Sequence, residues 1–99
     1  MENKVSLVSA NDFTKVFLYN DIEIYISRAY DEDSDKHFLV NSIKSIPSLN
    51  VHNIQYPILF ESEVQRDDAF NMFDENIAKV HIEGIIVEIT KRNDESKSL

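Results

Sequence analysis

The sequence predicts an α+β fold, in which a mostly antiparallel sheet of about four strands carries one long amphipathic helix, near residues 62–78, on one face. Three patterns support this fold class. Apolar residues alternate with other residues over 15–30 and again over 54–60, whereas apolar residues recur at helical spacing over 62–78. A chain of 99 residues that is 42 % hydrophobic has one core, so residues 1–99 form one small acidic domain.

The first element is a β-hairpin in the stretch KVFLYNDIEIYISRAY, residues 15–30. Apolar side chains occupy every second position after its centre, at Ile22, Ile24 and Ile26. Asn20 and Asp21 supply a two-residue turn, because both residue types tolerate the positive φ that such turns require. The polar segments at the two ends of the chain, residues 1–4 and 92–99, are expected to be frayed.

Residues 38–46, FLVNSIKSI, fit two structures. Helical spacing separates three of the apolar residues, Leu39, Ile43 and Ile46. Ser34 supplies an N-cap for such a helix, but Phe38 and Val40 also fit the start of another strand. Pro47 ends either element. A second, short helix near 38–46 is the expectation, with a strand as the alternative.

Residues 54–60 predict a strand in which every second residue is apolar: Ile54, Tyr56, Ile58 and Phe60. Pro57 lies between them and has no N–H group to donate to a neighbouring strand. We therefore expect this strand at an edge of the sheet or at a bulge.

The long helix near residues 62–78 is expected to begin at Ser62 as the N-cap, with acidic residues in the first turn, where the helix dipole favours negative charge. One face carries the apolar residues Ala69, Phe70, Phe73 and Ile77. The acidic residues lie to one side of this face: Glu63, Asp67 and Asp74, with Asp68 and Glu75 further round.

The segment VHIEGIIVEITK, residues 80–91, is expected to be the last strand. Its apolar residues change from even to odd positions at Gly84, the one glycine of the chain. A β-bulge at Gly84 would bring both halves onto one face.

The net charge of −8 is concentrated in two segments. Residues 21–35 contain six acids against Arg28, and residues 61–75 contain six acids against Arg66, so each segment has a charge of −5. Such segments repel phosphate backbones and anionic lipid surfaces, so we expect no direct binding to nucleic acid or membranes. The expected partner is a basic surface of another protein, and the candidate contact residues are Asp31, Glu32, Asp33, Asp35, Glu63, Asp67, Asp68, Asp74 and Glu75.

In size and charge alone, the chain resembles the DNA-mimicking anti-restriction and anti-CRISPR proteins of phages and mobile elements, and also toxin-immunity proteins. The resemblance implies a small acidic inhibitor whose carboxylates take the place of phosphates on a nucleic-acid-binding partner.

The segment YDEDSDKH resembles the first half of a calcium-binding EF-hand loop, because Asp31, Asp33 and Asp35 alternate along it. The pattern then fails, because Lys36 and Ser42 stand where the loop needs glycine and a bidentate glutamate. We therefore expect a solvated loop and no metal site. A divalent-metal sensor or small enzyme that uses these aspartates with His37 is the less favoured alternative.

The composition also argues against an enzyme and a cofactor. The chain has no cysteine and one glycine, which excludes thiolate chemistry, phosphate-cradling loops and the G-x-S-x-G nucleophile motif. His81 and Glu83, on one side of the expected last strand, are interpreted as a surface pair. Without a signal peptide or an apolar run of membrane-spanning length, a soluble cytoplasmic protein is expected.

The main alternative function is a homo-oligomeric structural or accessory module, as in a homodimer. Its copies would join through the edge strand near Pro57 or through an open sheet face. Aromatic residues that one helix cannot all cover suggest this face: Phe17, Tyr19, Tyr25, Tyr30 and Tyr56.

Overall fold

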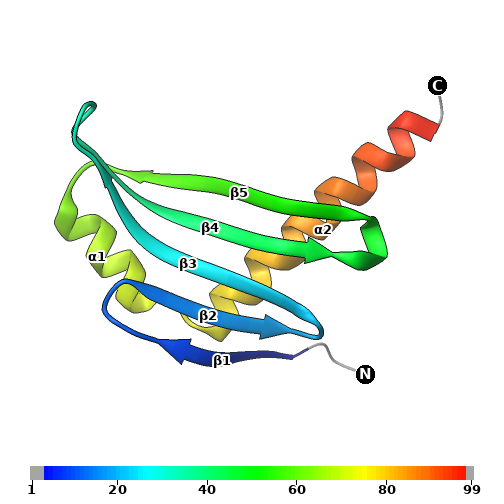
Figure 1. Ribbon diagram of the computed structural model, residues 1–99, viewed down its shortest axis with the longest axis horizontal. Helices are drawn as coiled ribbons and strands as arrows, with labels where there is room; N and C mark the ends of the chain where they lie inside the picture. The colour runs from blue at the N-terminus through cyan, green and yellow to red at the C-terminus, as the bar shows by residue number, and fades with distance from the viewer. Residues whose placement is uncertain (1–3, 98–99) are drawn as a thin grey trace.

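The computed structural model describes residues 4–97 and shows an α+β fold. Five antiparallel strands form one sheet in the order of the chain. They are β1 (Val5–Ala10), β2 (Thr14–Tyr19), β3 (Ile22–Asp31), β4 (Lys36–Ile46) and β5 (Val51–Phe60). A short 3₁₀ turn, Pro47–Leu49, joins β4 to β5, and the chain ends with helices α1 (Glu63–Met72) and α2 (Glu75–Lys97). Figure 1 looks onto the sheet, with α2 crossing behind it.

The predicted hairpin is confirmed as β2 and β3. Tyr19 pairs with Ile22, and Asn20 in the turn has a φ of 53°, in the left-handed region that the turn requires. The long β3 strand also pairs with β4, and both run on to the acidic turn at residues 32–35.

The expected short helix near residues 38–46 is wrong, because this segment is the strand β4. It pairs with β3 on one side and with β5 on the other, as at Ile43, which lies between Ile24 and Ile54. Ser34 caps no helix, since its hydroxyl donates to the carboxylate of Asp31 at 2.8 Å. Pairing with a strand on each side therefore decides the conformation of this segment, because the helical spacing of its apolar residues extends over only eight residues.

Both edges of the sheet are irregular. Strand β5 is one edge, as Pro57 predicts, and pairs with β4 alone. The other edge is β1, a strand that the sequence analysis did not predict, whose register with β2 shifts between Leu7 and Ser9.

The predicted helix over residues 62–78 is two helices. Ser62 caps α1 as expected, since its hydroxyl accepts a hydrogen bond from the backbone N–H of Gln65. Phe73 then adopts an extended conformation with a ψ of 108°, and α2 begins at the next turn. The break allows the Phe73 ring to pack on Phe17, at 5.6 Å between ring centroids.

The expected last strand over residues 80–91, with its bulge at Gly84, is also wrong, because these residues lie within helix α2. Ile82, Ile85 and Ile89 recur at helical spacing and pack at or against the core. The helix continues through residues 92–97, which were expected to be a frayed end. Residues 1–3 and 98–99 lie outside the described residues.

The core lies between the helices and one face of the sheet. Its largest fully buried side chains are Phe17, Ile24, Ile26, Leu39, Ile43, Ile46, Ile82 and Asn41. Side chains on the other face of the sheet, among them Tyr25 and Phe38, are half-buried.

Candidate functional site

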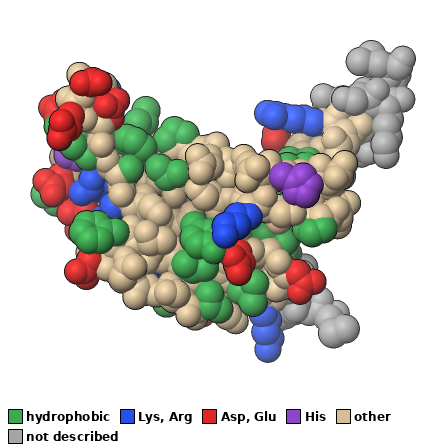
Figure 2. All heavy atoms as spheres, viewed as in Figure 1, with side chains coloured by type: hydrophobic (Ala, Val, Ile, Leu, Met, Phe, Trp, Pro, Cys, Tyr) green, Lys and Arg blue, Asp and Glu red, His purple; other side chains and the backbone are tan. Residues whose placement is uncertain are grey.

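Parts of the two acidic segments lie at one end of the molecule. The turn between β3 and β4 and the start of α1 lie at the same end of the sheet (Figure 1). In the space-filling view of Figure 2, Asp and Glu side chains gather along this end. Residues about 30 positions apart in sequence therefore contribute to one surface.

The β3–β4 turn exposes its acidic side chains to solvent. Asp31, Glu32, Asp33 and Asp35 are all exposed. The Tyr30 hydroxyl donates to the Asp35 carboxylate at 2.8 Å, and the Tyr30 ring stacks on His37 at 4.7 Å between centroids. These contacts orient the turn and leave some of its carboxylate oxygens without a hydrogen bond inside the turn.

Helix α1 is attached to this end through Arg66. This guanidinium is buried, and its Nη1 donates to the backbone oxygen of Ala29 at 2.9 Å. A hollow of about 400 Å³ lies between α1 and the sheet, with Tyr30 and Glu63 among its lining residues. Arg28 and Arg66 also line this hollow, whereas none of residues 31–35 does, so the acidic turn lies at the same end of the sheet but outside the hollow.

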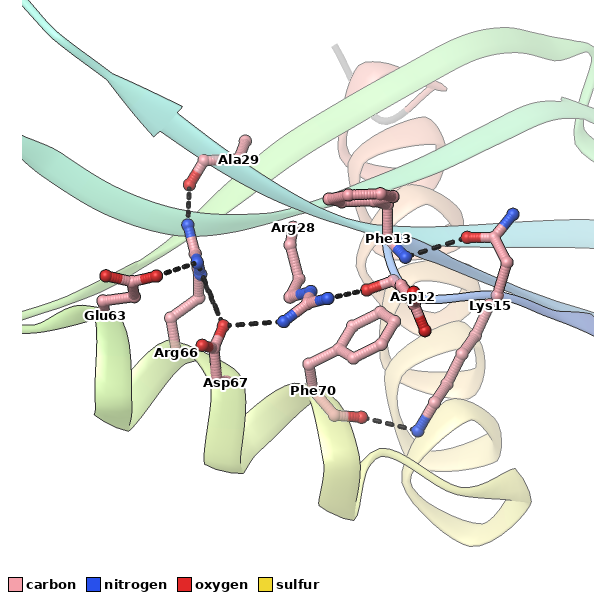
Figure 3. A network of polar contacts seen from close by, with 10 residues as sticks. Asp12, Phe13, Lys15, Arg28, Ala29, Glu63, Arg66, Asp67 and Phe70 are labelled. Carbon is pink, nitrogen blue, oxygen red and sulfur yellow. Dashed lines mark hydrogen bonds and ion pairs between the residues drawn. The ribbon is translucent and has the colours of Figure 1, made fainter.

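Asp67 does not lie free on this surface, although the sequence analysis placed it among the partner contacts. Figure 3 shows its carboxylate between two guanidinium groups, 3.1 Å from Nη1 of Arg28 and 3.0 Å from Nη2 of Arg66. Partial desolvation raises the pKa of Asp67, but hydrogen bonds and charge from Arg66 and Arg28 outweigh this effect, and the pKa lies below its usual value. Asp67 is thus a structural residue that joins α1 to β3.

Asp74 and Glu75 also lie apart from the acidic end, at the junction between α1 and α2. The Asp74 carboxylate caps α2 by accepting a hydrogen bond from the Ile77 N–H at 3.0 Å. Glu75 occupies the first turn of α2. The predicted acidic stripe of Glu63, Asp67 and Asp74 is therefore divided between a surface residue, an ion-pair residue and a helix cap.

We define the acidic end by the exposed residues that remain: Asp31, Glu32, Asp33, Asp35, Glu63 and Asp68. Exposed aromatic rings accompany these carboxylates, since Phe13 is 67 % and Tyr30 is 47 % exposed. Both rings line the 400 Å³ hollow. The sequence analysis missed Phe13, and its polar neighbours offered no pattern that would single it out.

The acidic end does not have the geometry of a metal centre. Among residues 4–93, whose side chains the structure describes, no group of three or more His, Asp or Glu side chains is arranged to hold a metal ion. The carboxylates of Asp31 and Asp35 instead form hydrogen bonds inside the turn.

A second hollow, of about 580 Å³, lies between strand β5 and helix α2. Its walls are mostly apolar, and the hydroxyl of Tyr56 lies 3.2 Å from Nδ1 of His81. Burial lowers the pKa of His81 and raises that of Tyr56. The sequence analysis missed this hollow because it placed His81 on a strand.

Neither helix within residues 4–97 has the length and apolar character required to cross a membrane. No protein-family model matches the chain, and the searches of curated proteins and of solved structures find no match.

Proposed function

We propose that this protein is a non-enzymatic binding module of the cytoplasm, which presents its acidic end to a basic surface of another protein and inhibits or recruits that partner. The observation that carries the proposal is that exposed acidic residues of the β3–β4 turn and of α1 lie at the same end of the sheet. Six exposed carboxylates around this end attract a basic partner and increase its association rate.

Charge alone gives little specificity, and the acidic end also offers apolar contacts. Phe13 and Tyr30 expose their rings next to the carboxylates, and Val64 at the start of α1 is 69 % exposed. Aromatic side chains inside a charged rim are the usual composition of a protein interface. A partner with apolar side chains among its lysines and arginines fits this surface.

The narrower form of the proposal is that the partner binds nucleic acid, and that the carboxylates of the acidic end take the place of phosphates. This form agrees with the resemblance in size and charge to anti-restriction and anti-CRISPR proteins of phages and mobile elements. Duplex DNA then competes with the protein for its partner.

The test compares two charge-reversal variants with the same change in charge. Glu32→Lys with Asp68→Lys alters the acidic end at residues without a structural hydrogen bond. Asp21→Lys with Glu23→Lys is the control with the same change in charge, because these residues lie near the β2–β3 turn, at the opposite end of β3. Glu23→Lys also removes the exposed hydrogen bond that the Tyr25 hydroxyl donates to Glu23 at 2.7 Å, so circular dichroism checks that the control keeps its fold. Asp67 and Asp74 are avoided, since reversing them breaks an ion pair and a helix cap.

Immobilised wild-type protein and both variants are incubated with lysate at low and moderate salt. The proposal expects a protein that the wild type and the control retain, and that the acidic-end variant loses at least tenfold. Moderate salt should also weaken its binding. Equal retention by both variants, or binding that salt does not affect, would contradict the proposal. Purified partner with competing duplex DNA then tests the narrower form.

A further inference from the structure

The hollow of about 580 Å³ between strand β5 and helix α2 has the size of a ligand pocket. One wall is β5 at residues 54–56, and the other is a face of α2 on which lining residues recur at helical spacing from Val80 to Arg92. Pockets that bind small organic molecules measure about 300–1,000 Å³. The six residues of the acidic end do not line this hollow, so a ligand here goes beyond the proposed function.

Isoleucine side chains form the apolar part of both walls. Ile54 of β5 and Ile85 and Ile89 of α2 pack against the core on one side and remain partly exposed on the other. Covering such apolar surface is favourable, because it removes that surface from water. The walls therefore favour a ligand with an apolar body.

Gly84 enlarges the hollow from the side of α2. Glycine is unfavourable in a helix interior, and it is usually explained by a close approach of another chain segment. Here, a Cβ atom added at Gly84 would have no atom within 4 Å beyond its own stretch of helix. The missing side chain thus leaves space in the hollow and does not serve the packing of α2 on the sheet.

Tyr56 and His81 form a polar point among these apolar walls. The Tyr56 hydroxyl lies 3.2 Å from Nδ1 of His81, and either group is the donor, depending on the tautomer of the ring. If the hydroxyl donates to His81, its oxygen can still accept a hydrogen bond. If it accepts from His81, its proton can still be donated. A ligand hydroxyl fits both cases, since it both donates and accepts.

The sheet holds a further polar side chain beside Tyr56. Asn41 lies opposite Tyr56 in the register of β4 and β5, so the two side chains share one face of the sheet. Asn41 is only 1 % exposed, and neither its Oδ1 nor its Nδ2 has a hydrogen-bond partner among the described residues. Native folds rarely leave such groups unsatisfied. The region around Tyr56 therefore has more hydrogen-bonding capacity than the described chain uses.

The lining has no net charge at neutral pH. Its acid and its base, Glu88 and Arg92, pair with each other at 3.2 Å. Burial lowers the pKa of His81 and raises the pKa of Tyr56, so that both rings are uncharged at pH 7. An ion therefore finds no unbalanced charge in this hollow.

An added peptide strand fits the β5 wall poorly. Asn53 has a left-handed φ of 56° and Pro57 has no N–H group, so residues 54–56 are bounded on both sides by an irregularity. Strand addition depends on a continuous row of backbone donors and acceptors along an edge. A small molecule has no such requirement.

We propose that this hollow binds a small uncharged phenol or alcohol, with its apolar body against the isoleucines and its hydroxyl group at Tyr56 and His81. The size of the hollow, the polar pair among apolar walls and the balanced charge of the lining together define this class of ligand.

NMR titration of the full ¹⁵N-labelled chain with 2-naphthol at pH 7 is the first test. Amide shifts should change around residues 54–56 and 80–92 and saturate with a dissociation constant below about 1 mM. No saturable change, or changes centred on the acidic end, would overturn the proposal. The same shifts on concentrating the protein alone would also overturn it, because they would show a second copy in the hollow.

Two relatives of 2-naphthol with the same ring system test the chemistry of the ligand. In 2-methylnaphthalene a methyl group replaces the hydroxyl, and it should bind more weakly by about threefold or more, although it is more apolar. The anion 2-naphthoate should also bind more weakly than 2-naphthol. Equal or tighter binding of the first would indicate a plain apolar patch, and of the second a site for anions, and either result contradicts the proposal.

Two variants place the ligand in the hollow. Gly84→Leu fills the space and should weaken 2-naphthol binding about tenfold or more while keeping the wild-type circular dichroism. Val87→Leu is the control on the same helix, because Val87 is 65 % exposed and does not line the hollow. Tyr56→Phe removes only a hydroxyl, and should abolish the preference for 2-naphthol over 2-methylnaphthalene without changing the binding of 2-methylnaphthalene.

Unchanged binding by Gly84→Leu, or a preference for 2-naphthol that Tyr56→Phe retains, would show that the ligand lies elsewhere. If Gly84→Leu alters the fold, Tyr56→Phe alone decides. Partner capture through the acidic end is measured separately, so either proposal can fail without the other.

Discussion

The Asp67 carboxylate of helix α1 lies 3.1 Å from Nη1 of Arg28 on strand β3, and this ion pair joins the helix to the sheet (Figure 3). Arg28 also donates to the backbone oxygen of Asp12 and lies over the ring of Phe70. Loop, strand and helix thus meet at one guanidinium group, which explains why Asp67 is held in the structure although it lies within an acidic segment.

Acid should therefore weaken the fold through Asp67. Its folded-state pKa lies below the ordinary value of 3.8, so the stabilisation is fully present above about pH 4 and is lost as the pH falls through the folded pKa. Asp67→Asn should lower the free energy of unfolding at pH 7 and flatten its dependence on pH below 4. Urea unfolding at a series of pH values measures both effects, and parallel curves for wild type and variant would contradict the role of the pair.

Lys15 should stabilise the end of α1. Its Nζ donates to the backbone oxygens of Phe70 and Phe73, at 2.6 Å and 3.0 Å. Lys15→Met leaves these carbonyl groups without a charged donor and should cost about 1–3 kcal/mol of unfolding free energy. Lys44→Met is the matched control, because Lys44 is exposed and its ammonium contacts only the Tyr25 ring among the described contacts, so its loss should change stability by under about 1 kcal/mol. Equal losses in the two variants would argue against the role of Lys15.

Gly84→Ala should distinguish a helix from the strand that the sequence suggested. Alanine favours a helix interior by about 0.5–1 kcal/mol over glycine, and the space around a Cβ at Gly84 is free. The variant should therefore be more stable, as measured by urea unfolding. Destabilisation by alanine would contradict the helical conformation of Gly84.

His81 should make the stability fall on mild acidification. Burial lowers its folded-state pKa below 6.5, so the unfolded chain binds the proton more tightly. The stability is then highest above pH 6.5 and decreases as the pH falls from 6.5 towards the lower folded pKa. His81→Gln should remove this part of the slope. Unfolding between pH 7.5 and 5.5 measures it, and identical slopes would show that the ring is not buried in its neutral form.

The hairpin, the edge position of Pro57 and the cap at Ser62 were predictable because each depends on residues close in sequence. A two-residue turn needs a positive φ, a proline lacks a donor, and a serine hydroxyl reaches an N–H three residues on. The acidic composition could also be read directly from the sequence. It predicted an acidic partner surface before the shape of that surface was known.

Two features depended on residues far apart. Residues 38–46 became a strand because β3 and β5 pair with them on both sides, and residues 80–91 became a helix because Ile82, Ile85 and Ile89 fit against the sheet. The signal for that helix was present in the spacing of these isoleucines, but β-branched residues and a glycine obscured it.

The sequence alone therefore determined the class of fold, the local turns and caps, and the amount of negative charge, since these follow from each residue and its near neighbours. Only the tertiary structure decided which carboxylates are exposed. Asp67 is paired by Arg28 and Arg66, and Asp74 caps α2, because the chain brings their partners to them when it folds. The same folding places the β3–β4 turn and α1 at the same end of the sheet, so that acidic residues from two separate segments are exposed at one end of the molecule.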